Sequence, residues 1–231
     1  MTAAPAVRLA VVFDLDGTLI DSAPDVRAAL NRLLAEEGRR QLSLPQVQDL
    51  VGEGAAALIE RAWAATGTKA TMAAGGAAAV AALVERYLAH YRACPAGQTV
   101  VYDGVMPLLE RLGAEGISLG ICTNKPQRMT EIVLHALGLS RHFAAILGGD
   151  FPRRKPDGEH IRETLRRMGA EGVPALYVGD SITDVRAARD AGLPVVAVDW
   201  GYARMPVAQL GADRLISSYA ELPAVIGELL P

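Results

Sequence analysis

Two short acidic motifs are the strongest chemical signal in the sequence. Asp14 and Asp16 lie in FDLDGTLID, and Asp180 and Asp184 lie in GDSITD. Carboxylates that folding brings together repel one another, and a cation such as Mg²⁺, which prefers oxygen ligands, offsets that repulsion. We predict that Asp14 and Asp180 bind the metal directly. Asp184 lies one helical turn after Asp180 on the same face, so it would bind through water or orient Asp180.

Gly17 and Thr18 directly follow the first pair of acids. Glycine allows a sharp turn in which backbone N–H groups face an anion. Turn residues are also common at the ends of strands for purely structural reasons. The chemical interpretation therefore depends on finding both acidic motifs and Lys155 in the same chain, in this order.

Thr123, Asn124 and Lys155 are the predicted phosphate-binding residues. Thr123 and Asn124 end the segment ISLGICTN, and Lys155 lies in RRKPDG. A threonine hydroxyl can donate a hydrogen bond to a phosphate oxygen. The compact charge of a lysine can balance a phosphate and an ionised Asp14. Pro156 disfavours a helix at Lys155 and favours an extended approach to the site.

The candidate residues stand at the carboxyl ends of predicted strands. A β-branched run over residues 8–13 predicts a buried strand that ends at Asp14. Helices and strands alternate after about residue 102, which indicates a parallel sheet covered on both faces. The predicted strands are 117–124, 144–149, 175–180, 193–199 and 214–216, and the predicted helices are 104–115, one from about 126, 157–168 and one that ends at 191. Because ligands bind outside the carboxyl ends of such strands, we expect the candidate residues to meet at one edge.

A helical segment interrupts this alternation between about residues 24 and 92. Apolar residues recur there at helical spacing, and no run resembles a strand. The predicted helices are 25–38, 44–51, 54–66 and 76–92, whereas the weakly patterned residues 66–79 allow no boundaries to be set. The simplest organisation is an α/β core with a helical insert after its first strand.

Composition and charge narrow the classes of function. The net charge is −3 and no extended cluster of Lys and Arg occurs, so the positive footprint of a nucleic-acid-binding protein is lacking. The apolar stretches are too short for a membrane helix, and the first residues do not resemble a signal peptide. We therefore expect a small-molecule partner rather than nucleic acid or a membrane, and the sequence leaves monomer and homodimer open.

The cysteines and histidines give no sign of a further site. Cys94 and Cys122 show neither metal-ligand nor disulfide spacing, which favours reduced thiols in a cytoplasmic protein. The four histidines also lack metal-ligand spacing and are interpreted as surface or helix residues: His90, His135, His142 and His160.

Taken together, four motifs resemble those of the haloacid dehalogenase superfamily. FDLDGTLID matches its first motif, ICTNK the second, RRKPD the third and GDSITD the fourth. The resemblance implies a Rossmann-like core with a helical cap domain, Mg²⁺ as cofactor and an aspartyl-phosphate intermediate. The core would comprise residues 1–21 and 101–231, and the cap residues 22–100.

The same resemblance implies a role for each motif residue. Asp14 would be the nucleophile, and Asp16 the general acid and base with its backbone carbonyl on the metal. Thr123, Asn124 and Lys155 would bind the phosphoryl group, Asp180 the metal, and Asp184, Gly17 and Thr18 would support them. Dehalogenases of this superfamily lack an acid at the position of Asp16, whereas cleavage of a phosphate ester needs a proton donor for the leaving oxygen and then a base for water. Asp16 therefore favours a phosphatase.

A closer resemblance to bacterial phosphoglycolate phosphatases extends into the insert. VGEGAAALIERA (51–62), YDGVMPLLERL and ICTNKPQRMT carry it. It predicts 2-phosphoglycolate as substrate, with glycolate and phosphate as products, and Gly52, Glu53 and Gly54 as a cap loop near the substrate. Lys125 or the N–H groups of the helix after Gly54 could hold the substrate carboxylate. Glu53 would repel it unless that side chain points aside or pairs with a base.

Other functions stay open at this stage. The glycine-rich loop is also compatible with a plain helix start. The substrate could be another small metabolite or sugar phosphate, and a phosphomutase would use the same intermediate. A non-enzymatic phospho-acceptor domain is disfavoured, because it needs neither Asp16 nor an insert of ~80 residues, far longer than an ordinary connection.

Overall fold

The computed structural model describes residues 7–67 and 76–230. Within them, parallel strands form a six-stranded sheet in the order β5-β4-β1-β6-β7-β8. The strands are β1 (Ala10–Phe13), β4 (Ser118–Cys122), β5 (Ala145–Leu147), β6 (Ala175–Gly179), β7 (Val195–Val198) and β8 (Arg214–Ile216). β1 lies between β4 and β6 and is buried on both faces, which explains its continuous apolar sequence. The α/β fold predicted from the sequence is confirmed.

Helices cover both faces of this sheet. Val11 and Phe13 of β1 face the cluster formed with α6 (Val105–Ala114), α7 (Gln127–Ala136) and α10 (Leu222–Leu229). Ala10 and Val12 face the opposite cluster, formed with α8 (Glu159–Arg167) and α9 (Ile182–Ala191). This alternation follows from the period of two in a strand. Two short 3₁₀ helices, Ser140–His142 and Val207–Gln209, lie in the connections.

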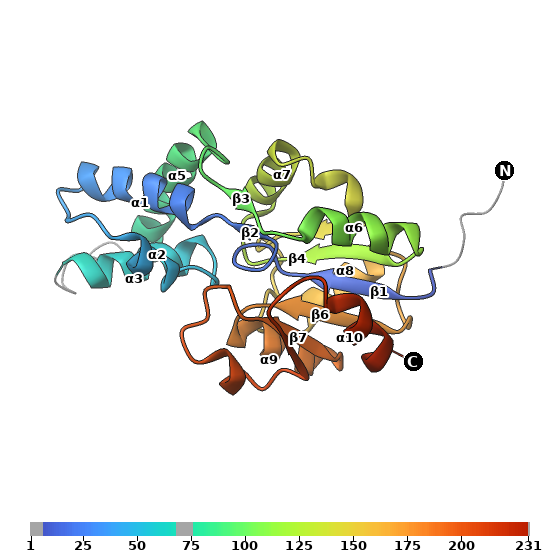
Figure 1. Cartoon of the computed structure of the whole chain (residues 1–231). Helices are drawn as coiled ribbons and strands as arrows, with labels where there is room; N and C mark the ends of the chain where they lie inside the picture. Colours follow the sequence, from blue (N-terminus) through green and yellow to red (C-terminus); the bar gives the residue numbers. More distant parts are fainter. Residues whose placement is uncertain (1–6, 68–75, 231) are drawn as a thin grey trace.

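The insert leaves and re-enters the core through a two-stranded antiparallel ribbon. β2 (Ile20–Asp21) pairs with β3 (Val100–Val101), with Ile20 opposite Val101 and Asp21 opposite Val100. Between these strands lie α1 (Ala23–Glu36), α2 (Leu44–Gln48), α3 (Ala55–Thr66) and α5 (Gly76–Ala93). Figure 1 shows these helices as a group beside the carboxyl end of β1, on the side opposite the C-terminus.

The insert has an apolar core of its own. Leu30, Leu33, Ile59 and Tyr91 belong to a buried cluster that draws on its helices, and Met129 of α7 joins this cluster from the core. Helix bounds agree with the predicted ones within a few residues, and the ribbon strands β2 and β3 were not predicted. Of the segment 66–79 that the sequence could not place, residues 68–75 lie outside the described residues.

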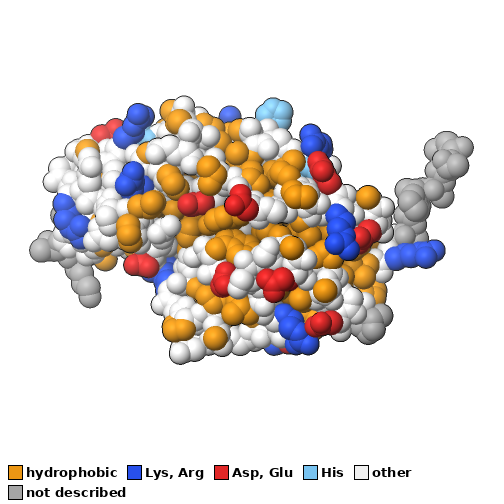
Figure 2. All heavy atoms as spheres, in the orientation of Figure 1, with side chains coloured by type: hydrophobic (Ala, Val, Ile, Leu, Met, Phe, Trp, Pro, Cys, Tyr) orange, Lys and Arg blue, Asp and Glu red, His pale blue; other side chains and the backbone are white. Residues whose placement is uncertain are grey.

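The surface carries charges of both signs. Figure 2 shows acidic and basic side chains interspersed on the face drawn. None of the helices in the described ranges has the length and apolar character needed to cross a membrane.

Candidate active site

The candidate residues of the first three motifs meet where the strands end. Asp14 directly follows β1, Thr123 follows β4, and Lys155 lies in the loop between β5 and α8. The Lys155 Nζ lies 2.8 Å from Asp14 Oδ1. Since the central strands are parallel, their carboxyl ends share one edge of the sheet, and the structure brings these residues together there.

Three buried carboxylates form the densest group at this edge. One oxygen from each of Asp14, Asp180 and Asp184 lies within 4.8 Å of the others. Burial raises the pKa of Asp14 to about 6 although the charge of Lys155 opposes it, and burial, followed by the charges of Asp184 and Asp14, raises the pKa of Asp180 well above its usual value. Negative charge is therefore under-compensated at this point, and hard carboxylate oxygens suit Mg²⁺. The donor set fits the metal that the sequence predicts.

Asp184 differs from the other two carboxylates because both of its oxygens are engaged. One accepts hydrogen bonds from Lys155 Nζ at 2.6 Å and Tyr177 Oη at 3.1 Å. The other accepts from the Ser181 hydroxyl at 2.5 Å, within the capping box that begins α9. Burial alone would raise the pKa of Asp184, but the charge and hydrogen bond of Lys155 lower it below its usual value. The geometry favours a supporting residue over a direct metal ligand.

Asp180 is held at the site by very close backbone packing. Its Oδ2 accepts a hydrogen bond from the Tyr202 N–H at 2.6 Å. Gly17 has φ of 84°, and a Cβ atom there would collide with the Asp180 carboxylate. Gly17 therefore satisfies two demands at once, a left-handed turn and a close approach, of which the sequence indicated only the first. The Tyr202 hydroxyl also donates to Asp21 Oδ1 at 2.5 Å, which links the loop after β7 to the ribbon.

Lys155 is positioned by a residue that sequence reasoning missed. The Lys155 backbone N–H donates to His160 Nδ1 at 3.2 Å, and His160 Nε2 donates to the Gly148 carbonyl at 3.1 Å. His160 is fully buried on α8, and burial followed by the charge of Lys155 lowers its pKa to about 4. It therefore holds together the two ends of the loop that carries Lys155. The apolar periodicity of α8, with Ile161 and Leu165, was the available signal that His160 faces inward.

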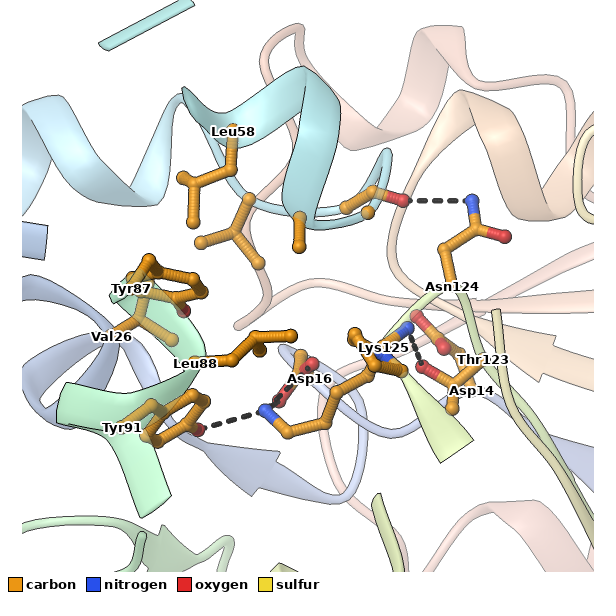
Figure 3. Close-up of a pocket in the computed structure, with 15 residues that line it drawn as sticks. Asp14, Asp16, Val26, Leu58, Tyr87, Leu88, Tyr91, Thr123, Asn124 and Lys125 are labelled. Carbon is orange, nitrogen blue, oxygen red and sulfur yellow. Dashed lines mark hydrogen bonds and ion pairs between the residues drawn. The ribbon is translucent and has the colours of Figure 1, made fainter. Parts of the chain in front are cut away.

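Asp16 lies beside Asp14 and makes contacts from two directions. Its Oδ1 accepts hydrogen bonds from Ser22 Oγ at 2.5 Å and from Lys125 Nζ at 2.9 Å. Lys125 also reaches Tyr91 of α5, with 2.8 Å between Nζ and the hydroxyl oxygen (Figure 3). Asp16 is thus linked both to the start of the insert and to its last helix.

Asn124 and Thr18 take places that the sequence did not specify. The Asn124 amide donates to the Gly52 carbonyl at 3.0 Å and to the Lys155 carbonyl at 3.1 Å, so it joins the second motif to the third and to the insert. Thr18 is fully buried, and its carbonyl accepts a hydrogen bond from Tyr219 Oη at 2.8 Å. Its hydroxyl has no hydrogen-bond partner among the described residues.

The loop of Gly52, Glu53 and Gly54 divides between two sides. Gly52 and Gly54 line the pocket that contains Asp14 and Asp16. Glu53 turns away and forms ion pairs with Arg61 at 3.1 Å and with Arg204 at 2.5 Å. The hydrogen bond from Arg204 lowers the pKa of Glu53. The condition set by the sequence, that Glu53 should point aside or pair with a base, is met twice.

The pocket itself lies between the core and the insert (Figure 3). Its volume is about 40 Å³, room for only a few water molecules. The core lines it with polar side chains, among them Asp14, Asp16, Thr123, Asn124 and Lys125, and the insert lines it mainly with Val26, Leu58, Tyr87, Leu88 and Tyr91. The space therefore has a polar wall at the strand ends and a mainly apolar wall on the insert.

Comparison with known proteins establishes the class. A family model described as haloacid dehalogenase-like hydrolase matches residues 11–198, most of the chain. The protein therefore belongs to the haloacid dehalogenase-like hydrolase family, as its four motifs predicted.

Within that family the chain is similar to proteins named phosphoglycolate phosphatase. The one from Rhodospirillum rubrum is 45% identical over 219 residues, covering 94% of this chain and 90% of its own length. The one from Agrobacterium fabrum is 39% identical and covers 100% of this chain and 97% of its own. A crystal structure described as a predicted phosphoglycolate phosphatase from Haemophilus somnus aligns with a TM-score of 0.83 at 28% identity, covering 94% of this chain and 96% of its own.

Proposed function

We propose that this protein is a Mg²⁺-dependent phosphatase that hydrolyses 2-phosphoglycolate to glycolate and phosphate. The observation that carries the reaction class is the position of Asp16, a second carboxylate in the same pocket as Asp14 and two residues further along the chain. The relatives named phosphoglycolate phosphatase support the choice of substrate.

The reaction proceeds in two displacements. Asp14 attacks phosphorus, the bond from phosphorus to the ester oxygen breaks, and Asp16 gives its proton to the departing oxygen. Asp16 then takes a proton from water, which attacks the phosphorus of the aspartyl phosphate and frees Asp14 and phosphate. Thr123, Asn124 and Lys155 frame the place of the phosphoryl group.

The side chains of Asp14 and Asp180 and the backbone carbonyl of Asp16 would hold the metal. When bound, Mg²⁺ supplies positive charge that stabilises the transferring phosphoryl group. Asp184 keeps Lys155 in place at 2.6 Å and, through its bond to the Asp180 N–H at 3.3 Å, fixes the turn that carries Asp180.

The substrate carboxylate binds at the start of α3. Gly54 is the N-cap of this 12-residue helix and has no side chain to cap its first N–H groups, and Gly54 and Ala55 both line the pocket. The positive end of a helix and its free N–H groups favour a carboxylate. Lys125, the other sequence candidate for this role, instead has its ammonium group on Asp16 and Tyr91.

The two parts of the chain have separate tasks in this proposal. Residues 1–21 and 101–231 form the catalytic core, and residues 22–100 form a cap that closes over it. The cytoplasm is the proposed setting, since the thiols of Cys94 and Cys122 are unpaired and stay reduced there.

A comparison of kcat/KM for 2-phosphoglycolate and ethyl phosphate tests the proposal. The two esters share their size but not the carboxylate. Losing a charge-assisted hydrogen bond costs ~1.5–3 kcal/mol. This energy corresponds to roughly a 10- to 150-fold preference for 2-phosphoglycolate, which is the result that we expect. Equal rates, or a much better sugar phosphate, would remove the substrate assignment. Transfer to a sugar hydroxyl without release of phosphate would remove the phosphatase assignment.

A further inference from the structure

Lys125 places a buried positive charge where the core meets the insert. Only 4% of its side chain is exposed. Its Nζ lies 2.9 Å and 3.2 Å from the two oxygens of Asp16, and 2.8 Å from the Tyr91 hydroxyl oxygen. The same nitrogen lies 4.7 Å from the centre of the Tyr91 ring. Figure 3 shows Lys125 reaching across the floor of the pocket between these two partners.

These contacts fix the ammonium group in one place. A buried charge is costly unless it is paired and hydrogen-bonded, and Lys125 meets that need with Asp16 and Tyr91. Asp16 and Tyr91 accept the hydrogen bonds that the Lys125 ammonium group would otherwise be free to donate to a substrate. The position of Lys125 is therefore set by the proposed proton donor and by the insert together.

Asp16 is held from its other side by the beginning of the insert. Ser22, fully buried between β2 and α1, donates its hydroxyl to Asp16 Oδ1 at 2.5 Å. Asp16 thus receives one donor from the residue where the insert begins and another from Lys125, which the last insert helix holds. Moving the insert away from the core would separate Tyr91 from Lys125.

A proton donor works only when it lies within hydrogen-bond reach of the leaving oxygen. A displacement of about 1 Å can lower a rate on the order of 10²-fold. A carboxylate two bonds away from its backbone can rotate freely unless donors restrain it. Lys125 and Ser22 are the donors that restrain Asp16.

We propose that Lys125 and Tyr91 are positioning residues that orient Asp16 when the insert lies against the core. Tyr91 holds the Lys125 ammonium group, and Lys125 and Ser22 fix Asp16 through Oδ1. Oδ2, which has only the longer contact of 3.2 Å with Lys125, is the oxygen that carries the proton toward the leaving oxygen. The inference rests on the acid role proposed for Asp16 and goes beyond it, because it links that role to the position of α5.

The test is the dependence of kcat/KM on the leaving group across substituted phenyl phosphates. A good leaving group such as 4-nitrophenolate needs little help from an acid, whereas phenolate needs more. We expect Lys125→Met to lower kcat/KM for phenyl phosphate by about 10- to 100-fold, a part of the ~10²–10⁴-fold effect of a general acid, and for 4-nitrophenyl phosphate by less than about 3-fold. Tyr91→Phe should steepen the dependence in the same direction, by about 3- to 10-fold for phenyl phosphate.

Two further variants make the result decisive. Asp16→Asn gives the steepest dependence expected and serves as the reference. Tyr87→Phe removes a hydroxyl from the same helix and the same pocket, one turn before Tyr91, and should leave the leaving-group dependence as in the wild type. Tyr91→Phe keeps the test valid if Lys125→Met does not fold.

The contrary outcomes are distinct. A uniform loss for all leaving groups in Lys125→Met and Tyr91→Phe would show a merely structural role and overturn the inference. A loss confined to 2-phosphoglycolate relative to ethyl phosphate would make Lys125 a substrate-binding residue and also overturn it. If Asp16→Asn itself leaves the dependence flat, the acid role of Asp16 fails first, and the inference falls with it.

Discussion

The two walls of the pocket are built on different principles. On the core wall the charged groups are buried and paired: Lys125 contacts Asp16 at 2.9 Å, and Lys155, behind the wall, contacts Asp14 at 2.8 Å. The insert wall is mostly apolar, with Leu58 and Tyr87, and its ion pairs, such as the one from Glu53 to Arg204, lie in exposed positions. The core wall can stabilise charge during a reaction, whereas the insert wall can sort molecules by size and shape.

This difference predicts unequal sensitivity to mutation. Buried charges lose several kcal/mol when one partner is removed, whereas exposed ion pairs contribute about 0–1 kcal/mol. Changes on the core wall should therefore abolish turnover or stability, and changes on the insert wall should alter substrate preference and affinity.

The largest expected effect is that of Asp14→Asn. The amide cannot attack phosphorus, so turnover should fall by more than the ~10²–10⁴-fold that loss of an acid–base group costs. Single-turnover kinetics with 2-phosphoglycolate measure it, and an unchanged circular dichroism spectrum confirms folding. If more than about a hundredth of the wild-type kcat survives, a loss no larger than that of an acid–base group, Asp14 is not the nucleophile.

Removal of Mg²⁺ should have the next largest effect. Chelation should abolish turnover, added Mg²⁺ should restore it, and Ca²⁺ should not, because Ca²⁺ prefers more ligands at longer distances. Mg²⁺ should also raise Tm, since it offsets the repulsion among Asp14, Asp180 and Asp184. Asp180→Asn, which removes a ligand, should blunt this rise in Tm. Full activity after exhaustive chelation would contradict the metal assignment.

A third prediction concerns His160, which positions Lys155, and the loss of stability at acidic pH. Because the pKa of His160 is about 4 in the folded protein and about 6.5 when unfolded, the unfolded chain takes up the proton first. Its contribution to stability is complete above pH ~6.5 and is lost as the pH falls toward 4, by at most ~3 kcal/mol. Urea unfolding at pH 7, 5.5 and 4.5 should show a smaller loss in His160→Gln than in the wild type. Parallel losses in the two proteins would contradict the prediction.

The smallest effect belongs to the insert wall. Arg204 of the core donates to Glu53 at 2.5 Å and to the Val51 carbonyl at 2.9 Å, so Arg204→Met should favour an open insert. We expect KM for 2-phosphoglycolate to rise about 2- to 5-fold with little change in kcat, as for an exposed pair of about 1 kcal/mol or less. High salt should reduce the difference. Arg61→Gln is the matched control, because Arg61 pairs with Glu53 inside the insert, and an equal rise in KM there would contradict this account.

Features that depend on local sequence could be predicted, whereas contacts between residues far apart in the chain could not. The strands and the acidic motifs were predictable because they depend on local periodicity and on the rule that ligands bind at strand ends. The contacts of Lys125 with Asp16 and of Arg204 with Glu53 join residues 109 and 151 positions apart, and periodicity carries no information about such pairs. His160 was interpreted as an ordinary surface or helix residue. It lies on a helix, but it is buried and its contacts position Lys155.

The short β2–β3 ribbon also has a consequence for how such an enzyme diversifies. Ile20 and Val101 are paired, so the chain leaves the core and returns to it at neighbouring points. Neighbouring antiparallel residues are about 5 Å apart, whatever lies between them in sequence. A different excursion of another length can be spliced in at this place at little entropic cost, since closure cost grows slowly with loop length. Evolution can therefore replace the insert, which would set substrate preference, while the catalytic core is kept.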